Sequence, residues 1–386
     1  MKTNILIDML PFQHPGGVGG ALSFTKTVYD ALFEKLTNAT NVYGAYDSTK
    51  GQAKQYNIFE YAQNHNITLL DISKRKPCEM IEANAIETFF IAFGQFYAGY
   101  NMSGISCKTI IFIHDIFDIE RCDNQIDMAI HDNMSHNLKA RIKRIVNLLS
   151  GRYHRMAKKR YKDIMQLYAS EKTLAYTVSN YSANALKYYF PEIKKDIRVC
   201  YAPTRKAVST TDVENPRLKE LITSGKPYLF MVAANRIYKN PSILMDVFKR
   251  LQKEESPLML LTLKYGKSIN KKHTDIDYLS DSDMDHAYRN AFALIFPSYF
   301  EGFGYPPIEA LACGTPTIAS NVTSVPEILG DAGLYFSPFY PADLYRAIHV
   351  LMDNHDARRI QMEQRHKEIV EKQKNDLQQL IKEITE

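Results

Sequence analysis

Short, β-branched apolar runs alternate with segments of helical periodicity along this chain, and that alternation restricts the possible folds more than any other feature. Runs such as Thr109-Ile-Ile-Phe-Ile113 and Tyr228-Leu-Phe-Met-Val-Ala233 are continuous in apolar residues, which is typical of strands buried on both faces of a parallel sheet. Repeated strand–helix units build doubly wound α/β layers. By this criterion we predict strands at residues 4–9, 41–46, 67–72, 88–93, 109–114, 174–179, 197–201, 228–233, 258–263, 276–279, 292–297, 317–320 and 334–336, and helices that include 22–36, 182–189, 241–252 and 341–352.

The length of the chain, 386 residues, exceeds one ordinary hydrophobic core, so two domains are expected. A polar stretch without periodicity, interrupted by Pro203, Pro216 and Gly225, favours a boundary there. We therefore predict an α/β protein with two Rossmann-like, doubly wound parallel-sheet domains, at residues 1–203 and 204–365. A charge-rich C-terminal helix at residues 366–386 should cross back to the first domain.

Composition excludes several classes of protein. No apolar run approaches the ~18 residues of a membrane-spanning helix, and the N-terminus lacks the features of a secretory signal. The five cysteines are scattered and never spaced C-x-x-C, which argues against a disulfide framework or a zinc site. The net charge of +5 is modest and accompanies no nucleic-acid reading motif. We expect a cytoplasmic protein with no nucleic-acid partner.

A glycine-rich turn follows the first predicted strand. The run Gly16-Gly17-Val-Gly-Gly20 leads into a helix that should begin near Ala21. Glycines let the backbone approach a ligand closely, and the amides at a helix N-terminus attract anions. The spacing differs from the dinucleotide fingerprint G-x-G-x-x-G. Ligand contact by Gly16 and Gly17 and a plain strand-to-helix turn are therefore both open.

The strongest local signal is the segment Phe296-Pro-Ser-Tyr-Phe-Glu-Gly-Phe-Gly-Tyr-Pro-Pro-Ile-Glu-Ala-Leu-Ala-Cys-Gly314. We expect Glu301 in a loop after a strand and Glu309 in the first turn of the following helix, which the two prolines would open. Both carboxylates should lie at the carboxyl end of a parallel strand, where open α/β sheets bind ligands. Carboxylates accept hydrogen bonds from vicinal sugar hydroxyls, and the free amides of residues 302–305 suit a phosphate. The alternatives are a capping Glu309 and a solvated Glu301.

This segment resembles the signature of retaining glycosyltransferases of the GT-B architecture, specifically glycosyltransferase family 4. The family motif places two glutamates, separated by seven residues, within F-x-E-G-F-G-x-x-x-x-E-A-x-A-x-G-x-P-V-I-A-S. The similarity continues through Thr315-Pro-Thr-Ile-Ala-Ser320 and Val325-Pro-Glu-Ile-Leu-Gly-Asp-Ala-Gly333, and more weakly over about residues 4–352. It implies that the two domains face each other across a cleft, with the donor bound by the second and the acceptor by the first.

The resemblance also implies roles for individual residues of the second domain. Glu309 would hold the ribose hydroxyls of a nucleotide-diphosphate sugar, and Glu301 would hold the transferred sugar. Phe303, Gly304 and Tyr305 would supply backbone contacts to the sugar and the diphosphate. The UDP- or GDP-linked sugar is a co-substrate, no other cofactor is implied, and the acceptor would be a saccharide or a lipid-linked compound.

Two further residues match the family pattern, and a third, Arg236, departs from it in spacing. Lys239, in Asn235-Arg-Ile-Tyr-Lys-Asn240, corresponds to the lysine that grips the diphosphate and offsets charge on the departing phosphate. The alternative is a surface lysine, whose charge at a helix start would oppose the dipole. Arg236 lies three residues before Lys239, where the family arginine usually lies five before. His114 ends a predicted strand and matches the histidine that contacts the donor sugar from the first domain.

A metal is not required by this chemistry. In a retaining transfer, the departing phosphate oxygen can take the acceptor's proton, so positioning and charge neutralisation carry most of the catalysis. The sequence Asp281-Ser-Asp283 imitates the D-x-D metal motif of a different architecture, but it opens a helix predicted at residues 284–290. Ser and Asp are favoured there as caps, so we predict capping and no metal site.

Residues 137–162 contain ten Lys or Arg and no Asp or Glu. A basic amphipathic helix of this kind can rest on an anionic membrane surface, here the inner face, or attract a lipid-diphosphate acceptor. The alternative is ordinary packing of its apolar stripe on the core. That stripe consists of Leu138, Ile142, Ile145, Val146 and Leu149.

Three functional hypotheses follow from the sequence. The favoured one is a retaining hexosyltransferase of bacterial-type polysaccharide or glycoconjugate assembly. A phosphorylase or sugar-nucleotide epimerase on the same fold is the second, and a sugar-transfer assay separates the two. A non-catalytic partner subunit is the third, and the intact Lys239, Glu301 and Glu309 count against it. A glycoside hydrolase is disfavoured, since a phosphate-gripping lysine would then have no purpose.

Overall fold

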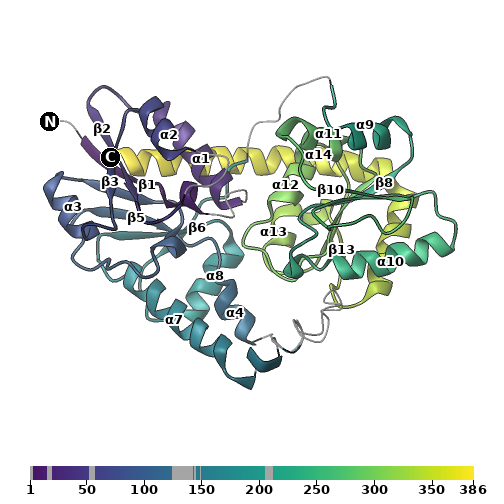
Figure 1. Ribbon diagram of the computed structural model, residues 1–386, viewed down its shortest axis with the longest axis horizontal. Helices are drawn as coiled ribbons and strands as arrows, with labels where there is room; N and C mark the ends of the chain where they lie inside the picture. Colours follow the sequence, from purple (N-terminus) through teal and green to yellow (C-terminus); the bar gives the residue numbers. More distant parts are fainter. Residues whose placement is uncertain are drawn as a thin grey trace. The chain divides into compact units, whose positions relative to one another are not determined.

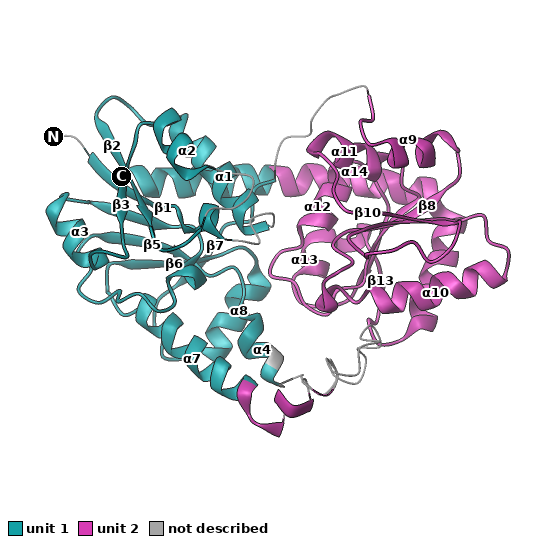
Figure 2. Ribbon diagram, viewed as in Figure 1, with its two compact units in different colours: residues 1–122, 153–205, 371–386 teal, residues 123–152, 206–370 magenta. Residues whose placement is uncertain are grey.

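The computed structural model describes residues 3–14, 20–51, 57–123, 142, 145–147, 149–204 and 212–386. The chain divides into two compact units, each built on its own parallel sheet (Figures 1 and 2). Unit 1 comprises Met1–Cys122, Tyr153–Arg205 and Glu371–Glu386, and unit 2 comprises Asp123–Arg152 and Lys206–Val370.

The sheet of unit 1 has seven parallel strands in the order β3-β2-β1-β4-β5-β6-β7. The strands are β1 (Thr3–Asp8), β2 (Thr40–Tyr46), β3 (Ile67–Asp71), β4 (Thr88–Ile91), β5 (Lys108–Phe112), β6 (Thr173–Thr177) and β7 (Ile197–Val199). The described helices of this unit are η1 (Leu10–Gln13), α1 (Gly20–Phe33), α2 (Ile58–Asn64), α3 (Pro77–Ala83), η2 (Gly94–Tyr97), α4 (Phe117–Asp123), α7 (Arg152–Leu167) and α8 (Asn180–Tyr189). The strand order reverses between β1 and β4, so the topological switch point lies there.

The sheet of unit 2 has six parallel strands in the order β10-β9-β8-β11-β12-β13. The strands are β8 (Tyr228–Met231), β9 (Met259–Leu263), β10 (His273–Ile276), β11 (Ala293–Phe296), β12 (Thr317–Ser320) and β13 (Leu334–Phe336). The described helices are α9 (Pro216–Thr223), η3 (Ile237–Lys239), α10 (Pro241–Lys253), α11 (Asp281–Arg289), α12 (Tyr305–Ala312), α13 (Val325–Leu329), η4 (Gly330–Ala332) and α14 (Pro341–Thr385). Here the switch point lies between β8 and β11, where Leu229 is paired with Ala293.

The predicted α/β class with two doubly wound parallel sheets is confirmed. Every residue of β4, β8, β11 and β12 is buried, which explains why these strands read as continuous apolar runs. The strand predicted at residues 276–279 is wrong, because the strand lies at His273–Ile276. The prediction missed this strand because two of its four side chains are polar. Both His273 and Asp275 are hydrogen-bonded to the Thr262 hydroxyl, at 2.8 and 2.6 Å.

The C-terminal helix α14 crosses from one unit to the other, as predicted (Figure 1). Its backbone leaves helical geometry at Asn354 (φ −134°, ψ 24°). Its last segment belongs to unit 1, where the Gln373 amide donates to the Ala202 carbonyl at 2.5 Å and the Asp376 carboxylate accepts the Tyr201 N–H at 2.9 Å. These hydrogen bonds hold the end of the chain against the strand β7 region of unit 1.

Among the described residues, no helix combines the length and the hydropathy of a membrane span. Each of the five cysteines lies within the described residues and forms no disulfide, and Cys107, Cys200 and Cys313 are buried.

Candidate active site

The loop from β11 into α12 carries both glutamates that the sequence singles out. Gly304 occupies the N-cap of α12 with φ +103°, a conformation that side chains other than glycine rarely adopt. The helix therefore begins at Tyr305, with proline in its first turn as expected. Glu309 lies beyond that first turn, so its predicted place in the turn is wrong. Glu301 lies in the loop before the helix, as predicted.

Lys239 and Glu301 form a buried ion pair. The Nζ of Lys239 lies 2.5 Å from Oε1 of Glu301, and the two side chains are only 8% and 11% exposed. The ammonium also lies 4.5 Å from the ring centroid of Phe296. These contacts exclude the reading of Lys239 as a surface lysine and of Glu301 as a solvated carboxylate.

The pair sits at the topological switch point of its own sheet. Lys239 follows β8 and Glu301 follows β11, and these two strands are neighbours on which the strand order reverses. A hydrogen bond of 2.8 Å from the Tyr299 N–H to the Tyr238 carbonyl joins the two loops. Asn240, at φ +52°, turns the chain from η3 into α10 and donates to the Pro338 carbonyl at 2.9 Å. Open α/β sheets bind ligands at such a point.

The turn that follows strand β12 holds the Glu301 loop in place through hydrogen bonds. The Glu301 N–H donates to the hydroxyl of Thr323 at 3.0 Å. The buried hydroxyl of Ser324 lies 3.1 Å from the Glu301 carbonyl and 3.0 Å from the Phe303 carbonyl. The loop that carries Glu301 is therefore held on both sides of that residue, and its backbone is organised before any ligand binds.

Glu309 is held by a residue that sequence reasoning missed. The hydroxyl of Tyr288, in α11, donates to Oε2 of Glu309 at 2.8 Å. Tyr288 is fully buried, and its ring lies edge-on to Phe230 with centroids 5.1 Å apart. The N-cap residue of α12, Gly304, has no side chain with which to cap the helix. An aromatic residue among core positions carries no sequence signal of this role, since only the packing of α11 beside α12 reveals it.

The other donor-binding candidates are placed differently. Arg236 is exposed and donates to the Tyr238 hydroxyl at 3.0 Å. Phe303 is buried, with its ring edge-on to Tyr305 at 5.9 Å. Gly16 and Gly17 lie outside the described residues.

His114 lies in unit 1, directly after β5. Its Nε2 is 2.9 Å from the Ala92 carbonyl, so this nitrogen carries the hydrogen and Nδ1 is left as an acceptor. The ring packs against Phe24 and Phe93, with centroids 4.7 and 4.6 Å away. Burial lowers the pKa of His114 to about 4. The imidazole is therefore neutral near pH 7 and suited to hydrogen bonding rather than to electrostatic attraction.

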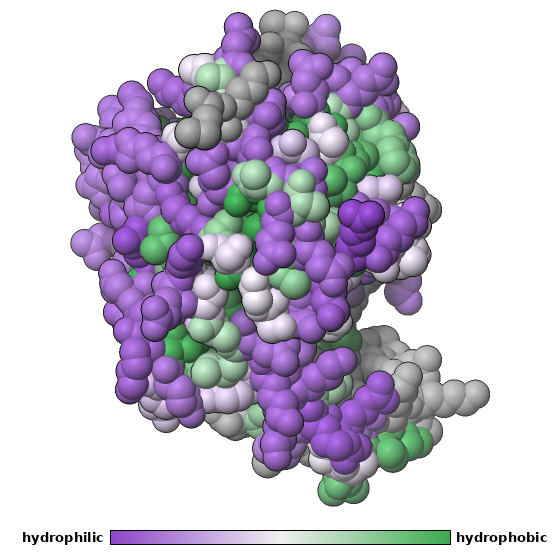
Figure 3. Space-filling model, turned by 90° about the vertical axis from the view of Figure 1, so that its left-hand side faces the viewer, coloured by the Kyte–Doolittle hydropathy of each residue, from purple (hydrophilic) through white to green (hydrophobic). Residues whose placement is uncertain are grey.

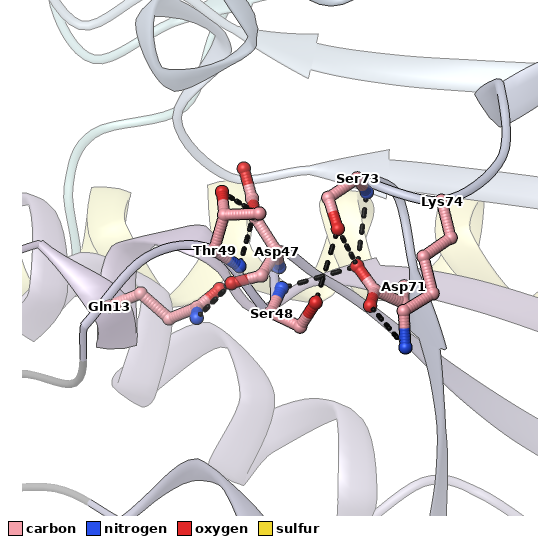
Figure 4. Close-up of polar contacts among 7 residues, drawn as sticks. All are labelled: Gln13, Asp47, Ser48, Thr49, Asp71, Ser73 and Lys74. Carbon is pink, nitrogen blue, oxygen red and sulfur yellow. Dashed lines mark hydrogen bonds and ion pairs between the residues drawn. The ribbon is translucent and has the colours of Figure 1, made fainter.

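A second polar cluster lies at the carboxyl ends of β2 and β3 in unit 1 (Figure 4). The Asp47 carboxylate accepts the Thr49 N–H at 2.9 Å, and the Asp71 carboxylate accepts the N–H groups of Ser48 and Ser73 at 3.2 and 3.0 Å. Burial opposes the charge of Asp71, but the hydrogen bonds from both serines outweigh it and hold its pKa well below the usual range. These carboxylates stabilise the loops that edge the sheet.

The Asp281-Ser-Asp283 sequence is a helix start, as predicted. The N-cap Ser280 accepts the Asp283 N–H, and both aspartates lie in the first turn of α11. The two carboxylate oxygens of Asp283 accept the N–H groups of Glu214 and Asn215 at 2.9 and 3.0 Å. Within the described ranges, we find no group of three or more His, Cys, Asp or Glu arranged to hold a metal ion.

Comparison with known proteins gives similarities to glycosyltransferases. Residues 212–369 match the family model described as "Glycosyl transferases group 1". Over 63 residues the chain is 48% identical to O-antigen chain mannosyltransferase B of Escherichia coli, a match that covers 16% of each protein. Over 70 residues it is 40% identical to O-antigen chain mannosyltransferase RfbU of Salmonella typhimurium, covering 18% of this chain and 20% of that protein. The chain thus matches only a fifth or less of the length of these relatives.

Solved structures match over the whole chain. Sucrose-phosphate synthase from Thermosynechococcus elongatus aligns with a TM-score of 0.63 at 14% identity, covering 98% of this chain and 97% of that one. WaaG, a glycosyltransferase involved in lipopolysaccharide biosynthesis, aligns with a TM-score of 0.61 at 12% identity over 99% of both chains. With two doubly wound parallel sheets, these matches identify the fold of the chain as GT-B.

Proposed function

We propose that this protein is a retaining glycosyltransferase that moves a hexose from a nucleotide-diphosphate sugar to a saccharide or a lipid-linked acceptor, in the assembly of a polysaccharide or glycoconjugate. The observation that carries the proposal is the buried ion pair between Lys239 and Glu301 at the switch point of unit 2. Glu301 lies on the same segment as Glu309. A charged pair hidden from water needs a reason, because burial of two charges rarely adds stability. Binding of a charged donor supplies that reason.

Each group has a place in this proposal. Lys239 would contact the diphosphate and offset the charge that builds on the leaving phosphate. The backbone N–H groups of residues 302–305, in the loop that leads into α12, would add donors to the same phosphate oxygens, since Pro306 and Pro307 have no N–H. Glu301 would accept hydrogen bonds from the sugar hydroxyls and Glu309 from the ribose hydroxyls. His114, neutral, would accept a hydrogen bond from the sugar through Nδ1.

The proton of the acceptor hydroxyl would pass to the departing phosphate oxygen, on the same face of the sugar as the new bond. The bond from the anomeric carbon to that phosphate oxygen breaks while the bond to the acceptor oxygen forms, and the nucleoside diphosphate leaves. The chain's residues then act by positioning and by neutralising charge. The same chemistry needs no protein-held metal, which agrees with the use of the Asp283 oxygens in backbone hydrogen bonds.

A mannosyl donor is the first to test, because the named relatives are mannosyltransferases. Thermal stabilisation should be screened with UDP- and GDP-linked sugars, and release of nucleoside diphosphate should then be followed with saccharide acceptors. Lys239→Ala and Glu309→Ala should each abolish measurable transfer in a folded protein. Lys249→Ala, an exposed lysine of α10, is the matched control and should retain activity.

The outcome of this assay distinguishes the hypotheses. Full activity of either Lys239→Ala or Glu309→Ala contradicts the assignment of the site. Conversion of the donor without an acceptor, or dependence on inorganic phosphate, would instead indicate an epimerase or a phosphorylase. Donor binding without release of nucleotide, across a broad set of acceptors, would indicate a non-catalytic subunit.

A further inference from the structure

Four aromatic rings meet at the topological switch point of unit 1. His14 follows β1 and His114 follows β5, while Phe93 and Phe96 follow β4, the strand between them in the sheet. The His14 ring stacks on Phe96, with centroids 4.9 Å apart and an angle of 15° between the planes. Phe96 packs against Phe93, and Phe93 against His114, with 4.6 Å between the centroids of each pair. These four rings form one aromatic row at the carboxyl ends of three parallel strands, where open α/β sheets bind ligands.

Hydrogen bonds tie together the three loops that carry the aromatic row. The carboxyl group of Asp8, at the end of β1, accepts the Leu10 N–H at 2.9 Å and the Phe93 N–H at 3.3 Å. The side-chain amide of Gln95 donates to the Asp115 carbonyl at 2.9 Å, which joins the loop after β4 to the loop after β5. The backbone that positions the rings is therefore fixed by contacts within unit 1 alone.

Part of the aromatic row is open to solvent. His14 is exposed, and Phe93 and Phe96 are only partly buried. Hydrophilic side chains predominate on the face of the molecule that Figure 3 shows, so a row of partly exposed aromatic rings differs from the surface there. Contiguous apolar groups on a protein surface often mark a binding site.

The aromatic row also has an unused hydrogen-bond acceptor beside it. Gln95 lies between Phe93 and Phe96 in η2, and its Oε1 atom is buried without a hydrogen-bond donor in the described part of the chain. Buried acceptors are normally paired, because an unpaired one has lost its water without compensation. A hydroxyl group of a bound ligand would supply the missing donor.

We propose that the aromatic row and Gln95 bind a pyranose ring of the acceptor, so that the acceptor is recognised as a saccharide. This inference rests on the proposed function and narrows the class of its acceptor. The C–H groups on one face of a pyranose pack on aromatic faces, whose π electrons carry partial negative charge, and the hydroxyls at its edge donate hydrogen bonds. The site has the same two-sided character, since aromatic rings lie next to an amide oxygen.

A phosphate group and an acyl chain match this site less well than a sugar does. Arg160 donates to the Gln95 carbonyl at 3.3 Å, but its guanidinium is paired with the Asp118 carboxylate at 3.1 Å. A phosphate would have to compete with that carboxylate for the cation. An acyl chain has no hydrogen-bond donor and would leave the Gln95 oxygen unpaired.

The test is saturation-transfer-difference NMR of the full chain with oligosaccharides, in the absence of any sugar donor. The probes are linear trisaccharides of mannose, of glucose and of N-acetylglucosamine, which differ in the arrangement of their polar groups. Saturation should pass to ring C–H protons of at least one of them, and a titration then gives its Kd. Phe96→Ala and His14→Ala should each weaken that binding by about fivefold or more, whereas Phe96→Tyr keeps an aromatic face and should stay within about twofold of the wild type.

Phe59→Ala is the matched control, because Phe59 is an exposed aromatic residue of α2 in the same unit. It should leave binding unchanged, and circular dichroism verifies that each variant is folded. The proposal is overturned if the folded wild type binds none of the trisaccharides, or if His14→Ala and Phe96→Ala both bind as tightly as the wild type. Displacement of the trisaccharide by inorganic phosphate or decanoate also overturns it, since the site would then prefer an anion or an acyl chain.

The same samples separate this proposal from the proposed function. Thermal stabilisation by UDP or GDP reports on the donor site of unit 2, which the aromatic row does not contribute to. Loss of saccharide binding with intact stabilisation by nucleotide therefore counts against the aromatic row and leaves the proposed transferase activity standing. Loss of nucleotide stabilisation with intact saccharide binding counts against the donor site instead.

Discussion

Replacement of Glu301 by glutamine should tighten the binding of a nucleoside diphosphate to this protein. In the described structure the Lys239 ammonium is neutralised by Glu301 at 2.5 Å, in a site where both side chains are about nine-tenths buried. A diphosphate that approaches Lys239 must therefore compete with a carboxylate already in place. Glu301→Gln keeps the size of the side chain and removes the competing charge.

The magnitude follows from the geometry. A phosphate charge on the far side of the ammonium would lie roughly 6 Å from the carboxylate, which corresponds to about 3 kcal/mol of repulsion at an effective dielectric constant of about 20. Screening and rearrangement will reduce this value. We expect a net gain of about 1–2 kcal/mol, which is roughly a five- to thirtyfold tighter Kd for UDP or GDP. The free variant should also unfold at a lower temperature, because Lys239 remains buried without its partner.

Isothermal titration calorimetry with UDP and GDP measures the affinity, and thermal unfolding with and without ligand measures the coupled stability. Transfer from the intact donor should fall in the same variant, since Glu301 is proposed to hold the sugar. Glu254→Gln is the matched control, because Glu254 pairs with Arg250 at 2.6 Å on the exposed side of α10 in the same unit. A folded Glu301→Gln protein that binds both diphosphates no more tightly than the wild type would refute the proposed contact between Lys239 and phosphate.

Three further predictions concern other residues. Tyr288→Phe removes the hydrogen bond to Glu309. In steady-state kinetics the KM for the donor should therefore rise about fivefold or more while kcat stays within about twofold. A fall of kcat as large as the rise of KM would contradict the role of Tyr288 in positioning Glu309. Burial raises the pKa of Asp8 from 3.8 to about 7, so the native state holds a proton that the unfolded chain releases above about pH 4. This stabilisation is complete below pH 4 and is lost as the pH rises through 7. The free energy of unfolding, measured in urea, should fall by about 2 kcal/mol between pH 5 and 7 in the wild type and should not fall in this way in Asp8→Asn. An Asp8→Asn protein with the pH dependence of the wild type would contradict this prediction. Because the pKa of His114 is about 4, the transfer rate should show no inflection from this residue between about pH 6 and 8, and His114→Gln should lower the rate without changing the shape of the pH profile.

Much of the fold could be predicted because buried parallel strands leave a direct trace in the sequence. Strands such as β8 and β11 are apolar at every position, so their runs stand out between helices. The edge strand β10 could not be found this way, since its His273 and Asp275 are satisfied by hydrogen bonds to Thr262 of the neighbouring strand. A strand whose polar groups are paired across the sheet has no apolar pattern to detect.

The sequence motif and its position in the fold were enough to select Glu301, Glu309 and Lys239 as candidate site residues. The burial of these residues and their hydrogen-bond partners could not be predicted from the sequence. The sequence left a surface lysine and a solvated Glu301 open, and the packing of two loops at the β8–β11 switch point makes them a buried pair. Tyr288 gave no signal at all, because a buried tyrosine looks the same in sequence whether its hydroxyl meets a carboxylate or a carbonyl.

By itself, the amino-acid sequence determined the class of fold, the order of strands and helices, and the segment that carries the charged site. These are properties of local composition and period, which a single segment expresses without its neighbours. The tertiary structure decided which charges lose their water, which hydroxyls hold them, and that the apolar residues before α7 stay exposed. The burial of a side chain and the identity of its hydrogen-bond partners depend on segments that are far apart in the chain. These properties therefore exist only once the sheets have formed.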